Sequence, residues 1–133
     1  MSNLLLIYGA SGTSGTIAIQ YGKYLGAKVT AVCSTGNIDM VKSLGAKNVI
    51  DYTKKDFTND NKKFNVIFDT VAKRTFLECK KVLADNGIYL TTFPTSEVLF
   101  KKISQSKNTG KRALFVAAGL IFFNDKIKNL QYL

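Results

Sequence analysis

The sequence predicts a doubly wound α/β fold around a six-stranded parallel sheet, and three observations support it. Short apolar runs alternate along the chain with segments of helical period. The runs are apolar on both faces, as strands are when helices cover a parallel sheet on two sides. A glycine-rich turn directly follows the first run. Right-handed crossovers then favour three layers and the strand order 3-2-1-4-5-6.

The first half of the chain has the pattern βαβαβ. The predicted elements are a strand over residues 4–8, a helix over 15–25, a strand over 28–33, a helix over 38–44 and a strand over 48–50. The polar segment TKKDFTNDNKK, residues 53–63, predicts a loop or a short helical turn.

The second half repeats this alternation less clearly. The predicted elements are a strand over residues 65–70, a helix over 75–83, a strand over 87–92, a strand over 112–118 and the start of a helix over 125–133. The two cysteines fall on apolar faces of these elements. Cys33 closes an apolar run, and Cys79 shares a helical face with Phe76 and Val82. Both are therefore expected to be free thiols in the core.

Length and composition indicate one soluble domain over residues 1–133. With 46% hydrophobic and 21% charged residues, the chain has the composition of a globular protein. Its longest apolar run, residues 113–123, is shorter than the roughly 17 to 25 residues that span a bilayer. The N-terminus has no basic segment followed by an apolar one. We therefore expect a cytoplasmic protein without a membrane partner.

The charged residues narrow the function classes. The chain has no histidine, which removes histidine-based acid–base catalysis and histidine–metal sites, and no metal site is expected. Its net charge is +10, but the lysines are scattered in pairs rather than clustered on one element. This distribution indicates a solvated surface that attracts anionic small molecules, and no nucleic-acid partner is expected.

The glycine turn is the main candidate site. In YGASGTSG, Gly9, Gly12 and Gly15 recur every third residue, and Ala10 takes the first position of the pattern G-x-G-x-x-G. At the middle position a missing side chain lets the backbone approach a pyrophosphate, and the last glycine allows close packing of the following helix. A purely structural tight turn is the alternative. The candidate phosphate-binding residues are Ser11, Gly12, Thr13, Ser14 and Gly15.

The end of the second strand bears on the choice of dinucleotide. An NAD site usually has Asp or Glu there, but the strand is followed by Ser34, Thr35 and Asn37, with no carboxylate before Asp39 in the sequence. A 2′-phosphate would meet hydroxyls and an amide, which favours NADP(H). The same residues also suit a turn and a helix N-cap, and the two roles are compatible.

Four segments together indicate a family: IYGASGTSGTIAIQYGKYLGAKVTAVCSTGN, VKSLGAKNVIDYTKKDF, NVIFDTVA and GIYLTTF. They resemble the coenzyme-binding Rossmann domain of the quinone oxidoreductase (zeta-crystallin-like) branch of the medium-chain dehydrogenase/reductase superfamily. The likeness covers nearly the whole chain and is weakest over residues 96–109.

The resemblance implies a zinc-independent oxidoreductase that transfers hydride from NADPH to a small-molecule acceptor, a quinone or an activated double bond. It implies pyrophosphate contacts at the glycine turn and a 2′-phosphate site formed by residues 34–37 with Tyr52. The positions that it implies for the nicotinamide side are Thr70, Val71, Thr92 and Phe93. No catalytic residue is identified. The alternative function is a dinucleotide-sensing module that catalyses no reaction.

The chain also departs from the family pattern. A basic residue frequent after the second strand is replaced by Gly36 or Asn37, which weakens the expected preference for NADP, and Ala72 replaces a common glycine. Family members carry a GroES-like catalytic domain built from sequence on both sides of this one. We therefore expect an excised domain that is inactive in isolation. In the family the last strand pairs across a dimer, which predicts a homodimer through residues 114–118; burial beneath a terminal helix is the alternative.

Overall fold

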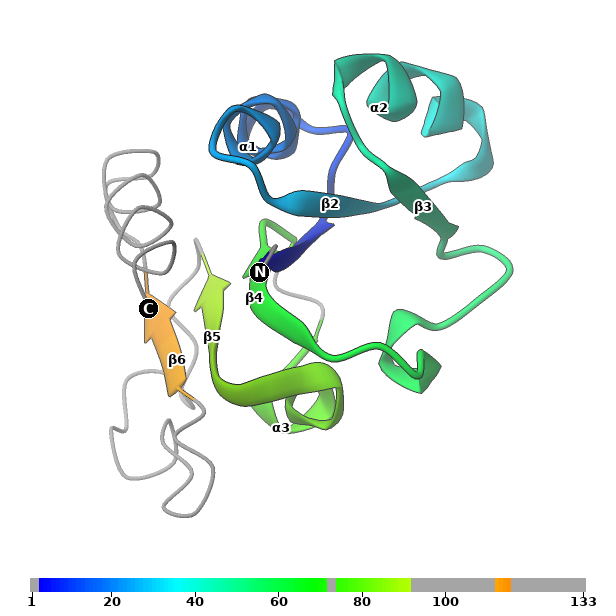
Figure 1. The fold of residues 1–133 in the computed structure, drawn as a ribbon. Helices are drawn as coiled ribbons and strands as arrows, with labels where there is room; N and C mark the ends of the chain where they lie inside the picture. The colour runs from blue at the N-terminus through cyan, green and yellow to red at the C-terminus, as the bar shows by residue number, and fades with distance from the viewer. Residues whose placement is uncertain (1–2, 72–73, 92–111, 116–133) are drawn as a thin grey trace.

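The computed structural model describes residues 3–71, 74–91 and 112–115. Its centre is a sheet of six strands in the order β3-β2-β1-β4-β5-β6 (Figure 1), and every neighbouring pair is parallel. The strands are β1 (Leu4–Tyr8), β2 (Lys28–Cys33), β3 (Asn48–Asp51), β4 (Phe64–Asp69), β5 (Leu83–Thr91) and β6 (Arg112–Phe115). The predicted strand order is confirmed.

Helical elements cover both faces of the sheet. Helices α1 (Thr13–Tyr24) and α2 (Ile38–Leu44) lie on one face, and α3 (Phe76–Cys79) lies on the other (Figure 1). Three short 3-10 turns complete the described elements: Thr35–Asn37, Phe57–Asn59 and Lys80–Val82. The three-layer α/β fold expected from the sequence is therefore present.

Along strands β1 to β5, side chains enter two hydrophobic cores, one on each face of the sheet. In β1, Leu5 and Ile7 pack into the core below α1 and α2, whereas Leu6 packs into the core on the α3 side. Each of these side chains is at most 1% exposed. Full burial of such a side chain stabilises the fold by about 1.5–3 kcal/mol. Cys33 and Cys79 are buried free cysteines in these two cores, as predicted.

The helix predicted over residues 75–83 is shorter than expected. Helix α3 has only four residues and continues as the turn Lys80–Val82. The chain then enters β5 at Leu83, which pairs with Phe64 of β4 before a register shift. This pairing makes the strand predicted over residues 87–92 begin four residues early. The predicted strand residues 116–118 and the predicted helix over residues 125–133 lie outside the described residues.

Within the described part of the chain, no helix has both the length and the apolar character needed to cross a membrane.

Candidate coenzyme-binding site

A pocket of about 530 Å³ lies at the carboxyl edge of the sheet. Its walls come from the ends of β1 and β2 and from the loops after β1, β2, β3 and β4. Strand β1 pairs with both β2 and β4, so this is where the strand order reverses and where ligands bind in doubly wound folds. The lining residues are Tyr8, Gly9, Ser11, Gly12, Val32, Cys33, Ser34, Asn37, Tyr52, Thr70 and Val71.

Gly9 lets the first turn pack closely against the loop after β4. Its φ of +83° is in the left-handed region, and a Cβ there would lie 2.2 Å from Thr70 Oγ1 and 2.5 Å from Val71 Cγ2. The Thr70 hydroxyl donates to the Tyr8 carbonyl over 2.8 Å. The missing side chain of Gly9 therefore allows two walls of the pocket to pack against each other.

Gly12 and Gly15 have different environments. A Cβ on Gly15 would lie 2.2 Å from the Gly9 carbonyl oxygen and 2.7 Å from Ala10 Cα, so this glycine is needed for the packing of helix α1 on the turn. A Cβ on Gly12 would meet only the Gly9 carbonyl oxygen, at 3.6 Å. Gly12 is also exposed and lines the pocket. Its missing side chain leaves space for a ligand, which fits a closely approaching diphosphate.

The N-terminus of α1 faces the turn without a competing anion. Gly12 is its N-cap, and among the described residues no side chain caps it and no acidic residue lies in its first turn. The first helical backbone bond runs from the Thr16 N–H to the Gly12 carbonyl, at 2.9 Å. The preceding N–H groups of Thr13, Ser14 and Gly15 have no acceptor within the helix. Together with the helix dipole they favour a bound anion.

The turn after β2 is held by its own polar side chains. The Asn37 amide donates to the Ser34 hydroxyl oxygen over 3.0 Å, and the Asn37 backbone N–H donates to the Ser34 carbonyl over 3.0 Å. Ser34 is the N-cap residue of the turn Thr35–Asn37 and Asn37 is the N-cap residue of α2, as expected from the sequence, but neither side chain makes a capping hydrogen bond. Both residues also line the pocket.

A carboxylate that the sequence argument missed lies beside this turn. Asp51, the last residue of β3, is the register partner of Cys33 at the end of β2. Its Oδ2 accepts a hydrogen bond from the Thr35 hydroxyl, and its Oδ1 accepts from the Thr53 N–H and hydroxyl at 2.9 and 2.6 Å. The bond from Thr35 is the main reason why the pKa of Asp51 is lowered. The expectation that this turn is free of carboxylates is therefore wrong.

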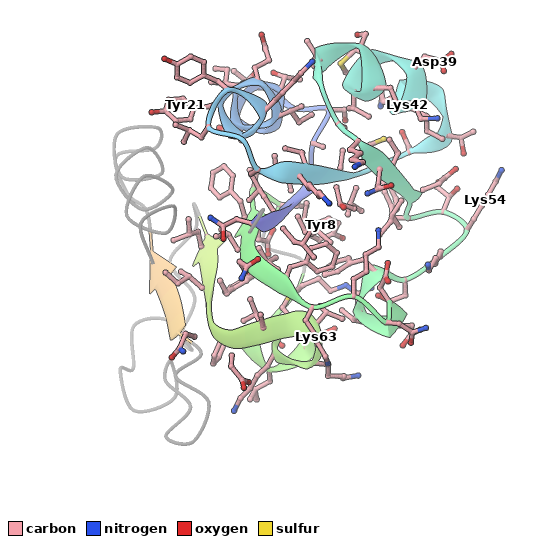
Figure 2. All side chains as sticks on the ribbon, in the orientation of Figure 1. Tyr8, Tyr21, Asp39, Lys42, Lys54 and Lys63 are labelled. Carbon is pink, nitrogen blue, oxygen red and sulfur yellow. The ribbon has the colours of Figure 1, made fainter. Side chains whose placement is uncertain are left out.

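The predicted strand order is the feature from which the position of Asp51 beside this turn could have been inferred. Parallel neighbours end at the same edge, so the last residue of β3 lies beside the turn after β2, although 16 residues separate it from Thr35. Asp39, the nearest carboxylate after that turn in the sequence, is exposed and points away on the outer surface of α2 (Figure 2).

Tyr8 is a second lining residue that the sequence reasoning did not single out. It ends β1, and its ring centroid lies 5.3 Å from that of Phe57. Partial burial raises the pKa of the Tyr8 phenol. The phenol is therefore protonated at neutral pH. Its position as the last residue of β1 is the sequence feature that could have predicted Tyr8 as a lining residue.

The wall formed by the loop after β4 is anchored by a buried carboxylate. Asp69 is 0% exposed, and its Oδ1 accepts from the Val71 N–H over 2.9 Å. The hydroxyl of buried Tyr89 lies 2.5 Å from Asp69 Oδ2 and 3.1 Å from the Arg74 carbonyl oxygen. These bonds hold both ends of the segment between Asp69 and Arg74.

Arg74 extends this network to the surface. Its guanidinium lies 2.9 Å from Asp56 Oδ1 and 2.8 Å from Glu78 Oε2. The bond to Arg74 lowers the pKa of Glu78, which also forms a capping box with Thr75 at the start of α3. Arg74 thus forms ion pairs with both the loop after β3 and helix α3.

The structure gathers seven predicted site residues around the pocket: Ser11, Gly12, Ser34, Asn37, Tyr52, Thr70 and Val71. Four others do not line it. Thr13 and Ser14 open α1, Gly15 packs against the turn, and Thr35 bonds to Asp51. Thr92 and Phe93 lie outside the described residues. No group of three or more metal-ligating side chains occurs in the part of the chain that is described.

Comparisons with known proteins agree with this architecture. Residues 15–100 match the family described as zinc-binding dehydrogenase. A chloroplast envelope quinone oxidoreductase homolog of Arabidopsis thaliana is 32% identical over 111 residues, which cover 77% of this chain and 34% of that protein. A 2-methylene-furan-3-one reductase of Solanum lycopersicum is 41% identical over 85 residues, covering 62% of this chain and 21% of that protein.

A solved quinone oxidoreductase from Coxiella burnetii covers 97% of this chain with a TM-score of 0.72 at 21% identity, and this chain covers 42% of it. The likeness to that structure supports the fold. The chain thus spans less than half of each of these three proteins. The family match covers more than half of the chain. The chain therefore belongs to the zinc-binding dehydrogenase family of the medium-chain dehydrogenase/reductases and is quinone oxidoreductase-like.

Proposed function

We propose that residues 1–133 form the coenzyme-binding domain of a zinc-independent reductase that transfers hydride from NADPH to a quinone or an activated double bond. The observation that carries the proposal is the open space at Gly12, which faces the pocket beside the N-terminus of α1. Membership of a dehydrogenase family implies a nicotinamide coenzyme, and these residues fit its diphosphate.

Each wall of the pocket has a part in binding. The N–H groups of Thr13, Ser14 and Gly15, which have no acceptor within the helix, bind the diphosphate, and the missing side chain of Gly12 lets it come close to them. The donors available to the ribose and its 2′-phosphate come from the second wall, Ser34, Asn37 and Tyr52.

On the third wall, Thr70 is bonded to Tyr8 and Val71 to Asp69. We propose these two residues for the nicotinamide side, together with Thr92 and Phe93, which the family resemblance alone implies. The bound coenzyme supplies the hydride chemistry, whereas the protein binds and orients it.

The choice of acceptor rests on the relatives. Those with similar sequences include a trans-enoyl reductase of Aspergillus terreus, 43% identical over 76 residues, and an NADPH-dependent alkenal/one oxidoreductase of Arabidopsis thaliana, 36% identical over 92 residues. Both names fit an acceptor with an activated double bond. Because the chain covers 21% and 24% of these proteins, we propose that the acceptor pocket needs further residues and that the isolated domain has no turnover. We also propose a cytoplasmic homodimer.

Thermal unfolding with NADPH and NADH in parallel tests the proposal. A ligand at about 100 times its dissociation constant adds about 2.7 kcal/mol to stability, so the melting temperature should rise, and NADPH should raise it more than NADH. Gly12→Val should keep the fold, because the added atoms meet no close protein neighbour, but should lose the shift. Gln20→Val, on the exposed side of the same helix, is the matched control and should keep it. A shift that survives Gly12→Val would place the coenzyme elsewhere.

A further inference from the structure

The carboxylate of Asp51 is held beside the pocket, although Asp51 is not one of its lining residues. Its main-chain neighbour Tyr52 and its register partner Cys33 both line the pocket. The Tyr52 N–H also donates to the Cys33 carbonyl over 3.1 Å, which fixes the two strand ends together. Because Thr35 and Thr53 donate to both carboxylate oxygens, the negative charge cannot swing away from the turn that carries Ser34 and Asn37.

Asp51 also changes the donors available in this turn. A hydroxyl group has a single proton to donate. The Thr35 hydroxyl donates its one hydrogen bond to Asp51 Oδ2, and the Thr53 hydroxyl donates its one hydrogen bond to Asp51 Oδ1. Neither hydroxyl can then donate to a phosphate oxygen. Of the hydroxyls and the amide expected around a 2′-phosphate, Thr35 is already occupied.

The charge of Lys54 does not cancel this effect. Lys54 is the lysine whose charge acts on Asp51, but its side chain is exposed and extends outward from the loop after β3 (Figure 2). A solvated lysine of this kind attracts an anion only weakly. A 2′-phosphate with a charge of about −1.5 to −2 would therefore meet a fixed like charge, whereas the 2′-hydroxyl of NADH would not.

We propose that Asp51 is a specificity-determining residue that lowers the affinity of the pocket for a 2′-phosphate and so brings NADPH and NADH binding closer together. Asp51 acts through its fixed negative charge and by accepting the one hydrogen bond that the Thr35 hydroxyl can donate. The inference rests on the proposed function, since it needs a dinucleotide in this pocket.

The substitution Asp51→Asn tests the proposal with little change in shape. The amide removes the charge, and its NH₂ group can donate to the Thr35 oxygen, which frees the Thr35 proton for a phosphate. Dissociation constants are measured by calorimetry for NADPH, NADH, 2′,5′-ADP and 5′-AMP on the full chain. We expect NADPH and 2′,5′-ADP to bind about fivefold more tightly or better, and NADH and 5′-AMP to change less than about twofold.

Two comparisons separate charge from structure. Asp85→Asn removes the same charge from an exposed site in β5 and should leave all four constants unchanged. The gain in Asp51→Asn should shrink between about 0.05 and about 0.5 M salt, because screening weakens the repulsion in the wild type.

The alternative outcomes are distinct. An equal change for phosphorylated and unphosphorylated ligands, or weaker binding of NADH and 5′-AMP in Asp51→Asn, would overturn the role given to Asp51 and assign it to the turn or to the ribose hydroxyls. If the wild-type chain binds the ligands and Asp51→Asn changes none of the dissociation constants, the role of Asp51 is overturned while the proposed function stands. A wild-type chain that binds none of the four ligands would overturn the proposed function itself.

Discussion

Gly12 and Gly15 lie three residues apart in one turn, yet side chains at the two positions meet different neighbours. The added Cβ of Gly15→Ala would come within 2.2 Å of the Gly9 carbonyl oxygen, so the turn or helix α1 must shift. We expect a loss of about 1–3 kcal/mol in the free energy of unfolding, measured with urea. Gly12→Ala should lose less than about 1 kcal/mol, since it meets only one atom at 3.6 Å. Equal losses would contradict the separate roles.

Burial controls the chemistry of the Cys79 thiol. It raises the pKa of Cys79 well above the ordinary value, so the folded thiol stays protonated while the unfolded thiol ionises above about pH 8.5. The stabilising effect is complete below that pH and is lost as the pH rises above it. Urea unfolding should show stability falling from pH 8.5 upward, with a smaller slope in Cys79→Ala. An identical slope in the two proteins would exclude this thiol as a cause.

The sequence pattern predicted some site residues and missed others for physical reasons. Ser34, Asn37 and Gly12 lie within four residues of a strand end, so the spacing of the elements was enough to place them on the pocket. Asp51 at the end of β3 bonds to Thr35 after the neighbouring strand β2, a contact that can be predicted only when strand order and register are combined. Thr13 and Ser14 open α1, and their backbone N–H groups rather than their side chains face the turn.

Strands β4 and β5 are joined by a buried polar contact as well as by their backbones. Tyr89 of β5 is 1% exposed and bonds to Asp69, which is 0% exposed. Tyr89→Phe removes the donor but keeps the ring, so we expect a loss of about 1–3 kcal/mol in the free energy of unfolding. Tyr24→Phe, at an 83% exposed position on α1, is the control and should change stability little. Similar losses in the two variants would mean that the contact adds no stability.

The elements differed in how well local pattern predicted them. Strands β1 and β2 and helix α2 match the predicted bounds, because their apolar periodicity agrees with their burial in the two cores. Helix α3 does not, because Leu83 pairs with Phe64 and the chain becomes a strand where its periodicity still suits a helix. Pairing between distant residues overrode the local signal there.

At the scale of the whole molecule, β6 ends the described strand order and pairs only with β5 within it. An apolar edge strand favours pairing with another copy of the chain. Light scattering over a concentration series should therefore show a homodimer, and Leu114→Lys should shift it toward the monomer with unchanged circular dichroism. A wild-type chain that stays monomeric at high concentration would contradict a dimer through this strand.

The central claim is that backbone N–H groups of the glycine turn bind the diphosphate of a nicotinamide coenzyme. The most direct measurement is an NMR titration of the labelled chain with NADPH. The account predicts that the largest amide shift changes, saturating with coenzyme, occur at Thr13, Ser14 and Gly15, with smaller ones at Ser34 and Asn37. Saturable changes that leave the amide signals of Thr13, Ser14 and Gly15 unmoved, or no changes at all, would contradict it.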